Sequence, residues 1–338
     1  MSAPMTDRYG PAARAALEGF GIRPADVRLH QVSENITFRA VDADGGAELV
    51  LRLHRPGYRT LAELESERAW TDSLTDAGIS VPRRRLAPTG VAYVPVEVDA
   101  SERRYAGLLD WIPGEPLADV LRRDADESLQ NRIAALMGTL LARLHEHSRH
   151  WRAPRDIQRP HYDVEGLLGE QPLWGRFWEH PALAASEREA LSEARHRLRA
   201  QLRTLPRDPT VYGMVHSDLH AENLLIEGDS LGAIDFDDAG FGWYHYDIAS
   251  ALKAFADQPG YAQRCQALLE AYRRVRPLGA QDETLLEAFL LIRDLALVGW
   301  YADRPEVQAI ETPVFERIKN RALRESERLL RQGATSAC

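Results

Sequence analysis

The chain has 338 residues, of which 44% are hydrophobic and 28% are charged, a balance typical of a folded globular protein. At ~100–200 residues per domain, this length predicts two domains or one unit with two lobes. Acidic residues outnumber basic residues by 51 to 42, for a formal charge of −9. That charge argues against a nucleic-acid partner, because a nucleic-acid binder needs a surplus of Lys and Arg to neutralise phosphates.

The two cysteines, Cys265 and Cys338, lie far apart and in no metal-ligand spacing. We therefore expect no zinc site, no disulfide framework and a reducing compartment, the cytoplasm. The first residues lack the basic start and the apolar run of a signal peptide. The most apolar stretch, 285–300, is interrupted by Glu287, Arg293 and Asp294, so it predicts a buried helix and no membrane partner.

The first third of the chain predicts a β-rich lobe, because apolar and polar residues alternate along several short runs. The residues of 42–46 are typical of a hairpin turn. The expected elements are the helices Ala12–Phe20 and Leu61–Ala77 and the strands Ile36–Val41, Glu48–Leu53, Val91–Val98 and Tyr105–Trp111.

After the Pro-Gly step of 112–114, strand patterns become sparse and helical patterns dominate. In Asp126–His150 the apolar residues recur at helical spacing, which predicts an amphipathic helix that faces a core. We expect an N-terminal lobe over 1–107, a hinge over 108–114 and a helical lobe over 115–338. The further elements expected are the helices Glu187–Leu205, Tyr261–Arg276, Thr284–Tyr301 and Pro313–Gln332 and the short strands Gly213–His216 and Leu231–Asp235.

The segment 215–238 combines acidic and amide side chains in a pattern that suits phosphoryl transfer. Asp218 follows a predicted strand, where a carboxylate can accept the proton of a hydroxyl group. Asn223 and Asp235 offer an amide oxygen and a carboxylate, which are ligands that Mg²⁺ prefers. Phosphoryl transfer consists mostly of positioning and charge neutralisation. The sequence therefore predicts Asp218 as the catalytic residue and Asn223 and Asp235 as the metal ligands.

The pattern His-x-Asp-Leu-His-x-x-Asn-x-Leu, followed by Ile-Asp-Phe-Asp-Asp, resembles the aminoglycoside phosphotransferase and choline kinase-like family, relatives of the protein kinases. The resemblance covers most of the chain. It implies a bilobed, protein-kinase-like α+β fold, and transfer of the γ-phosphoryl group of ATP to a hydroxyl group with the help of Mg²⁺. The segment 159–175 resembles an insert of members grouped with homoserine kinase type II and the bacterial stress-response kinases.

The same resemblance implies a nucleotide site. Arg52 stands where the family pattern has a lysine on the third strand, and a guanidinium can still contact phosphate oxygens. Glu67 is expected to brace Arg52, in preference to Glu63 and Glu65 on the same helix. No G-x-G-x-x-G covers the phosphates; the corresponding loop contains Ser33-Glu34-Asn35. The residues expected to bind the nucleotide are Ser33, Asn35, Arg52, Glu67, Leu109 and Trp111.

Several alternatives remain open. His216 and His220, with Asp218, could hold a transition metal in a phosphohydrolase, and a nucleotide-binding pseudoenzyme is a further possibility. The histidines of 145–150 invite a zinc site, but their spacing on a helix favours a solvated helix end. Asp247 is expected to be structural, as an N-cap of the next helix.

The acceptor is the least determined feature. Only a short segment separates Asp235 from Asp247, whereas a conventional protein kinase carries a long activation loop there. We therefore expect a small hydroxylated acceptor, near Asp163 and Trp174, and a monomer or homodimer. The acids that follow Asp235, at 237 and 238, suit an acceptor that carries an amine. The alternative is a protein serine/threonine kinase of the stress-response type.

Overall fold

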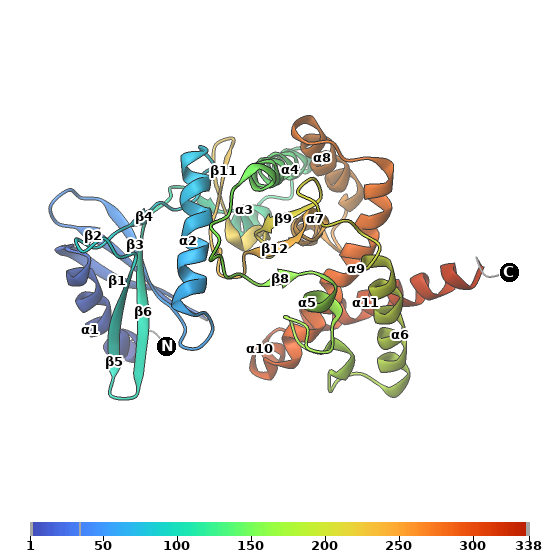
Figure 1. Cartoon of the computed structure of the whole chain (residues 1–338), viewed down its shortest axis with the longest axis horizontal. Coiled ribbons are helices and arrows are strands. Elements are labelled where there is room, and N and C mark those ends of the chain that lie inside the picture. The colour runs from blue at the N-terminus through green and yellow to red at the C-terminus, as the bar shows by residue number, and fades with distance from the viewer. Residues whose placement is uncertain (1–2, 34, 336–338) are drawn as a thin grey trace. The chain divides into compact units, whose positions relative to one another are not determined.

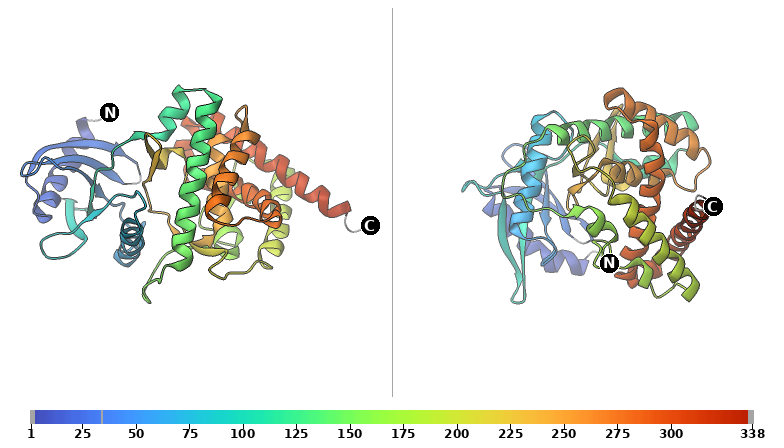
Figure 2. Two further views of the ribbon diagram at one scale, coloured as in Figure 1. Left: turned by 90° about the horizontal axis from the view of Figure 1, so that it is seen from above. Right: turned by 45° about the vertical axis from the view of Figure 1, so that its right-hand side comes forward.

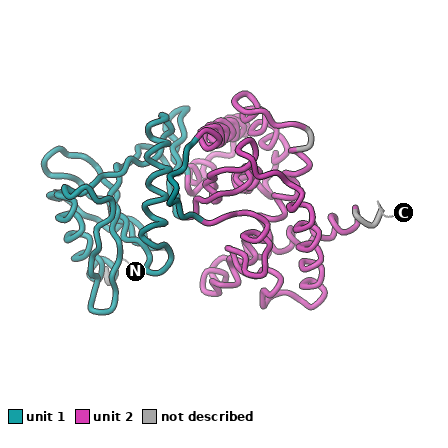
Figure 3. Tube along the Cα trace, in the orientation of Figure 1, with its two compact units in different colours: residues 1–116, 151–159, 224–237 teal, residues 117–150, 160–223, 238–338 magenta. Residues whose placement is uncertain are grey.

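The computed structural model describes residues 3–33 and 35–335. Glu34 of the expected nucleotide loop and the terminal Cys338 lie outside the described residues. The chain forms two compact units (Figure 3). Unit 1 contains 1–116, 151–159 and 224–237, and unit 2 contains 117–150, 160–223 and 238–338. The division of the chain at 108–114 stays a prediction.

Unit 1 is built on an antiparallel sheet of six strands, in the order β1-β2-β3-β6-β4 with β5 paired to β6. A second sheet has the order β11-β10-β7. The elements are α1 (Ala3–Gly19), β1 (Pro24–Val32), β2 (Ile36–Asp42), β3 (Glu48–Leu53), α2 (Leu61–Asp76), β4 (Arg84–Arg85), β5 (Tyr93–Asp99), β6 (Glu102–Asp110), β7 (Glu115–Pro116), β10 (Leu224–Glu227) and β11 (Ser230–Ala233).

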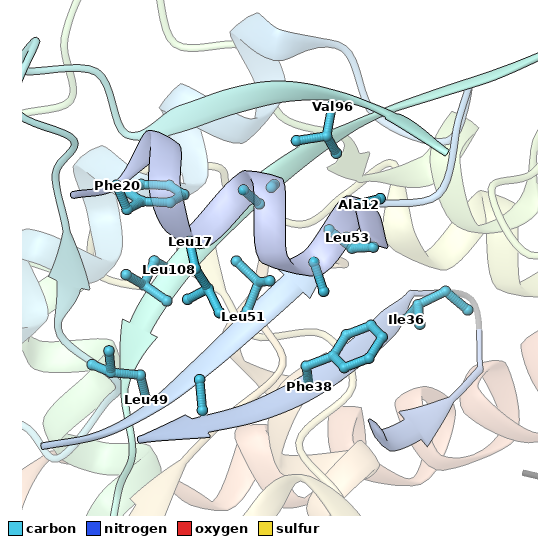
Figure 4. Packing of buried hydrophobic residues seen from close by; sticks show 14 of the residues in the cluster. Ala12, Leu17, Phe20, Ile36, Phe38, Leu49, Leu51, Leu53, Val96 and Leu108 are labelled. Atoms are coloured by element: carbon cyan, nitrogen blue, oxygen red, sulfur yellow. The ribbon is translucent and has the colours of Figure 1, made fainter. Parts of the chain in front are cut away.

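The core of unit 1 lies between α1 and the six-stranded sheet (Figure 4). Alternate residues of β3, Leu49, Leu51 and Leu53, point into this core and are buried. Leu17 of α1 and Phe20, just after this helix, cover them, and buried residues recur at helical spacing along α1. Because side chains alternate along a strand, the residue between Leu51 and Leu53 points to the opposite face of the sheet.

Unit 2 is mainly helical, with one small sheet of order β8-β12-β9 (Figure 1). In both views of Figure 2, α9 and α11 lie side by side. None of the described helices is long and apolar enough to cross a membrane. The elements are α3 (Leu117–Arg123), α4 (Glu127–His150), β8 (His161–Tyr162), α5 (Val164–Leu168), η1 (Phe177–Glu179), α6 (Ala185–Leu202), β9 (Tyr212–Val215), η2 (Ala221–Asn223), β12 (Gly240–Trp243), α7 (Tyr244–Leu252), η3 (Lys253–Phe255), α8 (Tyr261–Val275), α9 (Ala280–Ala302), α10 (Pro305–Ile310) and α11 (Thr312–Thr335).

The long helices agree with their hydrophobic periodicity. The helix expected over 126–150 is α4, and the helix expected over 61–77 is α2, which begins with a capping box between Thr60 and Glu63. The short helices α3, α5 and α10 and the short strands β4, β7, β8, β10 and β12 were not among the expected elements. Elements this short carry too few residues to display a period.

Gly138 allows α4 to approach α8 closely, since a Cβ atom at this position would lie 2.1 Å from the carbonyl oxygen of Leu268. We expect Gly138→Ala to destabilise the protein by about 1–3 kcal/mol, because overpacking forces the two helices apart. Gly45→Ala in the turn between β2 and β3 is the control: its Cβ meets nothing within 4 Å, so we expect a change in stability within about 0.5 kcal/mol. Urea unfolding of both variants tests this, and a Gly138→Ala protein as stable as wild type would contradict it.

Candidate active site

The catalytic loop, His216–Asn223, follows β9 and is held through its backbone. Ser217 has a left-handed backbone (φ 69°), a conformation that residues other than glycine rarely adopt. The Asp247 carboxylate accepts hydrogen bonds from the backbone N–H groups of His216 (2.8 Å) and Ser217 (2.5 Å). The Ser250 hydroxyl donates to the Ser217 carbonyl oxygen (2.9 Å). These contacts maintain a strained turn immediately before Asp218, as is typical of functional loops.

Asp247 lies in the first turn of α7, which begins at Tyr244, so its role differs from the expected N-cap. Its carboxylate is fully buried and also contacts His145 Nε2 (3.3 Å). His145 Nδ1 in turn lies 2.9 Å from the Tyr272 hydroxyl. His145 therefore belongs to the core beneath the catalytic loop, and it is not part of a solvated helix end. Burial lowers the pKa of His145, so a neutral imidazole is favoured there.

The Asp218 carboxylate lies between two basic side chains of unit 2. Arg293 forms an ion pair with Asp218 Oδ1, and His220 Nε2 lies 3.2 Å from Oδ2. Burial alone would raise the pKa of Asp218, but His220 and Arg293 outweigh burial and hold this pKa well below its usual value. The carboxylate is therefore ionised at neutral pH and can accept a hydrogen bond from a hydroxyl group.

Arg293 was not among the expected site residues. It projects from α9 and is buried, with its Nη1 at 3.3 Å from the Tyr246 hydroxyl. Its guanidinium lies over the rings of Trp174 (5.4 Å) and Tyr246 (5.9 Å). Tyr162 stacks against both rings, at 6.4 and 5.4 Å, and we call Tyr162, Trp174 and Tyr246 the aromatic cluster. The sequence offered one signal for Arg293, a charged residue inside an apolar helical pattern, since a buried charge requires a partner.

Asn223 lies at the end of the catalytic loop, in the same unit as Asp218. Its side-chain amide donates to the Asp218 carbonyl oxygen (3.0 Å). This bond occupies the nitrogen, so the amide oxygen of Asn223 is the atom that can face a cation.

In unit 1, Arg52 contacts two carboxylates of the segment that follows β11. Its Nη2 lies 2.8 Å from Asp235 Oδ1, and its Nη1 lies 2.9 Å from Asp237 Oδ1. Asp235 has a left-handed backbone (φ 63°), the second such residue of the predicted motif. The Asp235 side chain is 42% exposed, whereas the Asp237 side chain is only 9% exposed. Burial would raise the pKa of Asp237, but Arg52 outweighs it and lowers this pKa to about 2.

Asn35 and Ser33 occupy the loop between β1 and β2. The Asn35 side chain donates to Asp237 Oδ2 and accepts from the backbone N–H of Arg55 (2.9 Å). The backbone N–H of Ser33 donates to the Asn35 carbonyl oxygen (3.0 Å). Asn35 thus supports Asp237, and its predicted contact with the nucleotide stays a prediction, as does that of Ser33.

Glu67 lies on α2 and is buried, as expected for a partner of a cation. The ion pairs found for it join Arg84 Nη2 (3.4 Å) and Arg159 Nη1 (3.8 Å), whereas Arg52 pairs with the two aspartates described above. This arrangement differs from the direct Arg52–Glu67 pair that the resemblance implied. The competing Glu63 caps α2 at Thr60. The other competitor on this helix, Glu65, pairs with Arg68 (2.6 Å).

Leu109 and Trp111 lie at the end of β6 and just beyond it. Leu109 pairs with Val50 on one side and Arg84 on the other, while the Trp111 backbone N–H donates to the Glu48 carbonyl oxygen (3.0 Å). The Trp111 ring packs under the Arg39 guanidinium (4.6 Å). The predicted adenine contact of Leu109 and Trp111 stays a prediction.

The donor set suits Mg²⁺ bound together with phosphates. Within the described residues, no group of three or more His, Cys, Asp or Glu could hold a metal ion by itself. Mg²⁺ commonly takes one or two protein ligands and completes its shell with water and substrate phosphates. The exposed carboxylate of Asp235, in unit 1, and the amide oxygen of Asn223, in unit 2, are each ligands of this kind, and their joint binding of Mg²⁺ stays a prediction.

Comparison with known proteins gives the class. Residues 27–278 match the phosphotransferase enzyme family that includes the aminoglycoside phosphotransferases. A solved microcompartment-associated aminopropanol kinase is 30% identical, with a TM-score of 0.75 and 94% of each chain covered. The homoserine kinase of Methylobacillus flagellatus is 30% identical over 72% of this chain and 76% of its own. Amicoumacin kinase hAmiN, solved with AMP-PNP, Ca²⁺ and Ami, shares the fold at 19% identity (TM-score 0.77, 96% of each chain).

The chain therefore belongs to the phosphotransferase enzyme family. It is a phosphotransferase of the kinase type. The predicted resemblance and the α+β fold class, with an N-terminal antiparallel sheet and a helical C-terminal part, are confirmed.

Proposed function

We propose that the protein transfers the γ-phosphoryl group of ATP to a hydroxyl group of a small acceptor that carries an amine. The observation that carries the proposal is the state of Asp218, an ionised carboxylate after a left-handed residue on a loop anchored to buried Asp247. Such a carboxylate can orient a hydroxyl group and accept its proton as the oxygen–phosphorus bond forms. In the same displacement the bond between the γ-phosphorus and the oxygen that bridges it to the β-phosphate breaks, and ADP leaves with that oxygen.

The residues proposed to bind the phosphates of ATP and the metal ion are two residues of unit 1, together with Asn223. Asp235 and Asn223 would hold Mg²⁺, which when bound neutralises charge on the phosphate oxygens. Arg52 adds a fixed guanidinium that can donate two hydrogen bonds to phosphate oxygens. The reaction requires residues of both units to act on the same ATP molecule.

Two observations favour a small acceptor. Strand β12 begins at Gly240, and α7 starts directly after it at Tyr244, so regular structure takes up the segment in which protein kinases carry an activation loop. Trp174, the partly exposed member of the aromatic cluster, contacts Arg293, the ion-pair partner of Asp218, and aromatic faces attract cations such as an ammonium group. The names of the homoserine and aminopropanol kinases also denote small amino alcohols. Asp237 no longer supports the amine, because it is engaged by Arg52 and Asn35.

The test uses radiolabelled ATP with two acceptor pools, a set of small amino alcohols and a dialysed protein extract. We expect label in the amino alcohols, and at least about tenfold less in analogues whose amine is replaced by a methyl group, since a lost charged contact is worth about 1.5–3 kcal/mol. The Asp218→Asn variant serves as the blank for contaminating kinases. Label in protein alone would favour the stress-response type of kinase and contradict the proposed acceptor.

A further inference from the structure

The segment Asp235-Phe236-Asp237 presents two carboxylates to one guanidinium, and the two differ in their surroundings. Arg52 uses a separate terminal nitrogen for each, at 2.8 Å from Asp235 and 2.9 Å from Asp237. Asp235 is partly exposed, as a metal ligand must be. Asp237 is nearly buried, so solvent screens its attraction for Arg52 much less.

Asp237 is also held by residues other than Arg52. Asn35 donates to its second carboxylate oxygen, and the Asp237 backbone carbonyl oxygen accepts from Arg59 Nε (3.0 Å) and Arg159 Nη2 (2.6 Å). Arg52 and Asn35 therefore hold the carboxylate, and Arg59 and Arg159 hold the backbone that carries it. A carboxylate held in this way can orient the planar guanidinium of Arg52 at little further loss of conformational entropy.

Glu67 attracts Arg52 by its charge, but the ion pairs found for Glu67 are with other arginines. It pairs with Arg159, and the same guanidinium donates to the carbonyl oxygens of Phe236 (3.0 Å) and Asp237 (2.6 Å). Its other partner is Arg84. Glu67 thus supports the segment that carries Asp237, and Arg52 is left to the aspartates.

We propose that Asp237, in place of Glu67, is the residue that positions Arg52 for the phosphates of ATP. The inference rests on the proposed function. When Asp235 turns to a cation, Asp237 still holds Nη1 of Arg52, and Nη2 is released for a phosphate oxygen. An arginine can serve both partners because its nitrogens form a rigid fork, whereas a lysine presents a single ammonium. The ion pair between Arg52 and Asp237 therefore also explains why β3 carries an arginine at position 52.

The experiment measures binding of Mg²⁺–AMP-PNP by calorimetry in two double-mutant cycles, so that no acceptor is needed. One cycle combines Arg52→Met with Asp237→Asn, and the other combines Arg52→Met with Glu67→Gln. We expect Asp237→Asn to weaken binding about tenfold in the presence of Arg52 and about twofold or less in its absence, because contacting residues are not additive. In the other cycle, the loss of affinity in the Arg52→Met, Glu67→Gln double variant should equal the product of the two separate losses within about twofold.

Adenosine provides the control for a merely structural effect, since it lacks the phosphates that Arg52 contacts. Asp237→Asn should leave adenosine binding unchanged, and Asp237→Glu, which restores the charge, should recover part of the AMP-PNP affinity if the Asn variant folds poorly. Wild-type protein that binds no Mg²⁺–AMP-PNP would contradict the proposed function and this inference with it. Two outcomes would contradict this inference alone, provided that the wild-type protein binds Mg²⁺–AMP-PNP. One is that the effects of Arg52→Met and Asp237→Asn on binding are additive, and the other is that Arg52→Met is coupled to Glu67→Gln instead.

Discussion

Asp218→Asn is expected to slow phosphoryl transfer by ~10²–10⁴-fold, the range for a positioned general acid or base. The amide keeps the size of the side chain and an acceptor oxygen, but it has no charge and cannot take up the hydroxyl proton. ATP affinity should change little, because Asp218 is assigned to the acceptor. Single-turnover measurement of ADP formation, with an acceptor that the wild-type protein phosphorylates, provides the test.

The control for this prediction is Glu97→Gln, outside the catalytic loop. Glu97 pairs with Arg103 at the surface (3.6 Å), and both side chains are largely exposed, so the pair contributes little. We expect less than about a twofold change for this variant, as surface pairs of this kind are worth roughly 0–1 kcal/mol. Near-full turnover by Asp218→Asn, with an unchanged melting temperature, would refute the assignment of the base.

Asp235→Ala is expected to abolish the Mg²⁺ dependence of nucleotide binding. Asp235 is the anionic ligand proposed for the metal, and a neutral amide such as Asn223 cannot replace its charge. The same change removes one of the two carboxylates on Arg52, so binding of AMP-PNP without metal should be as strong as in wild type or stronger. Calorimetric titration with and without Mg²⁺ separates these two effects.

Asn223→Ala is the graded comparison for the metal site, and we expect it to weaken the Mg²⁺ dependence without removing it. Equal Mg²⁺ titration curves for wild type and Asp235→Ala would show that Asp235 is not a ligand. A loss of metal-free binding in Asp235→Ala would instead indicate that the variant disturbs Arg52.

The sequence identified the residues of the candidate site that lie within one stretch of the chain. Asp218, Asn223 and Asp235 belong to one continuous motif, and the roles that this motif suggests for them stay predictions. The strands around Arg52 were also predictable, because Leu49, Leu51 and Leu53 alternate with polar residues and are buried as a set.

The partners of these residues could not be predicted, since they come from distant segments. Arg293 lies 75 residues beyond Asp218 and was visible only as a charge in an apolar helix. Arg159 likewise reaches Glu67 from a distant segment of the chain. The order of residues in the chain does not show which buried charged side chains form ion pairs, because these pairs depend on tertiary packing.

The interleaving of the two compact units constrains how the protein can be divided. Unit 1 takes the strands β10 and β11 and residues 151–159 from the middle of the chain, and β10 completes its sheet by pairing with β7. A gene fragment that ends near residue 116 would therefore encode neither Arg159 nor the aspartates that hold Arg52. Unit 1 therefore cannot be transferred to another protein as one continuous stretch of sequence, because segments of unit 2 separate its parts.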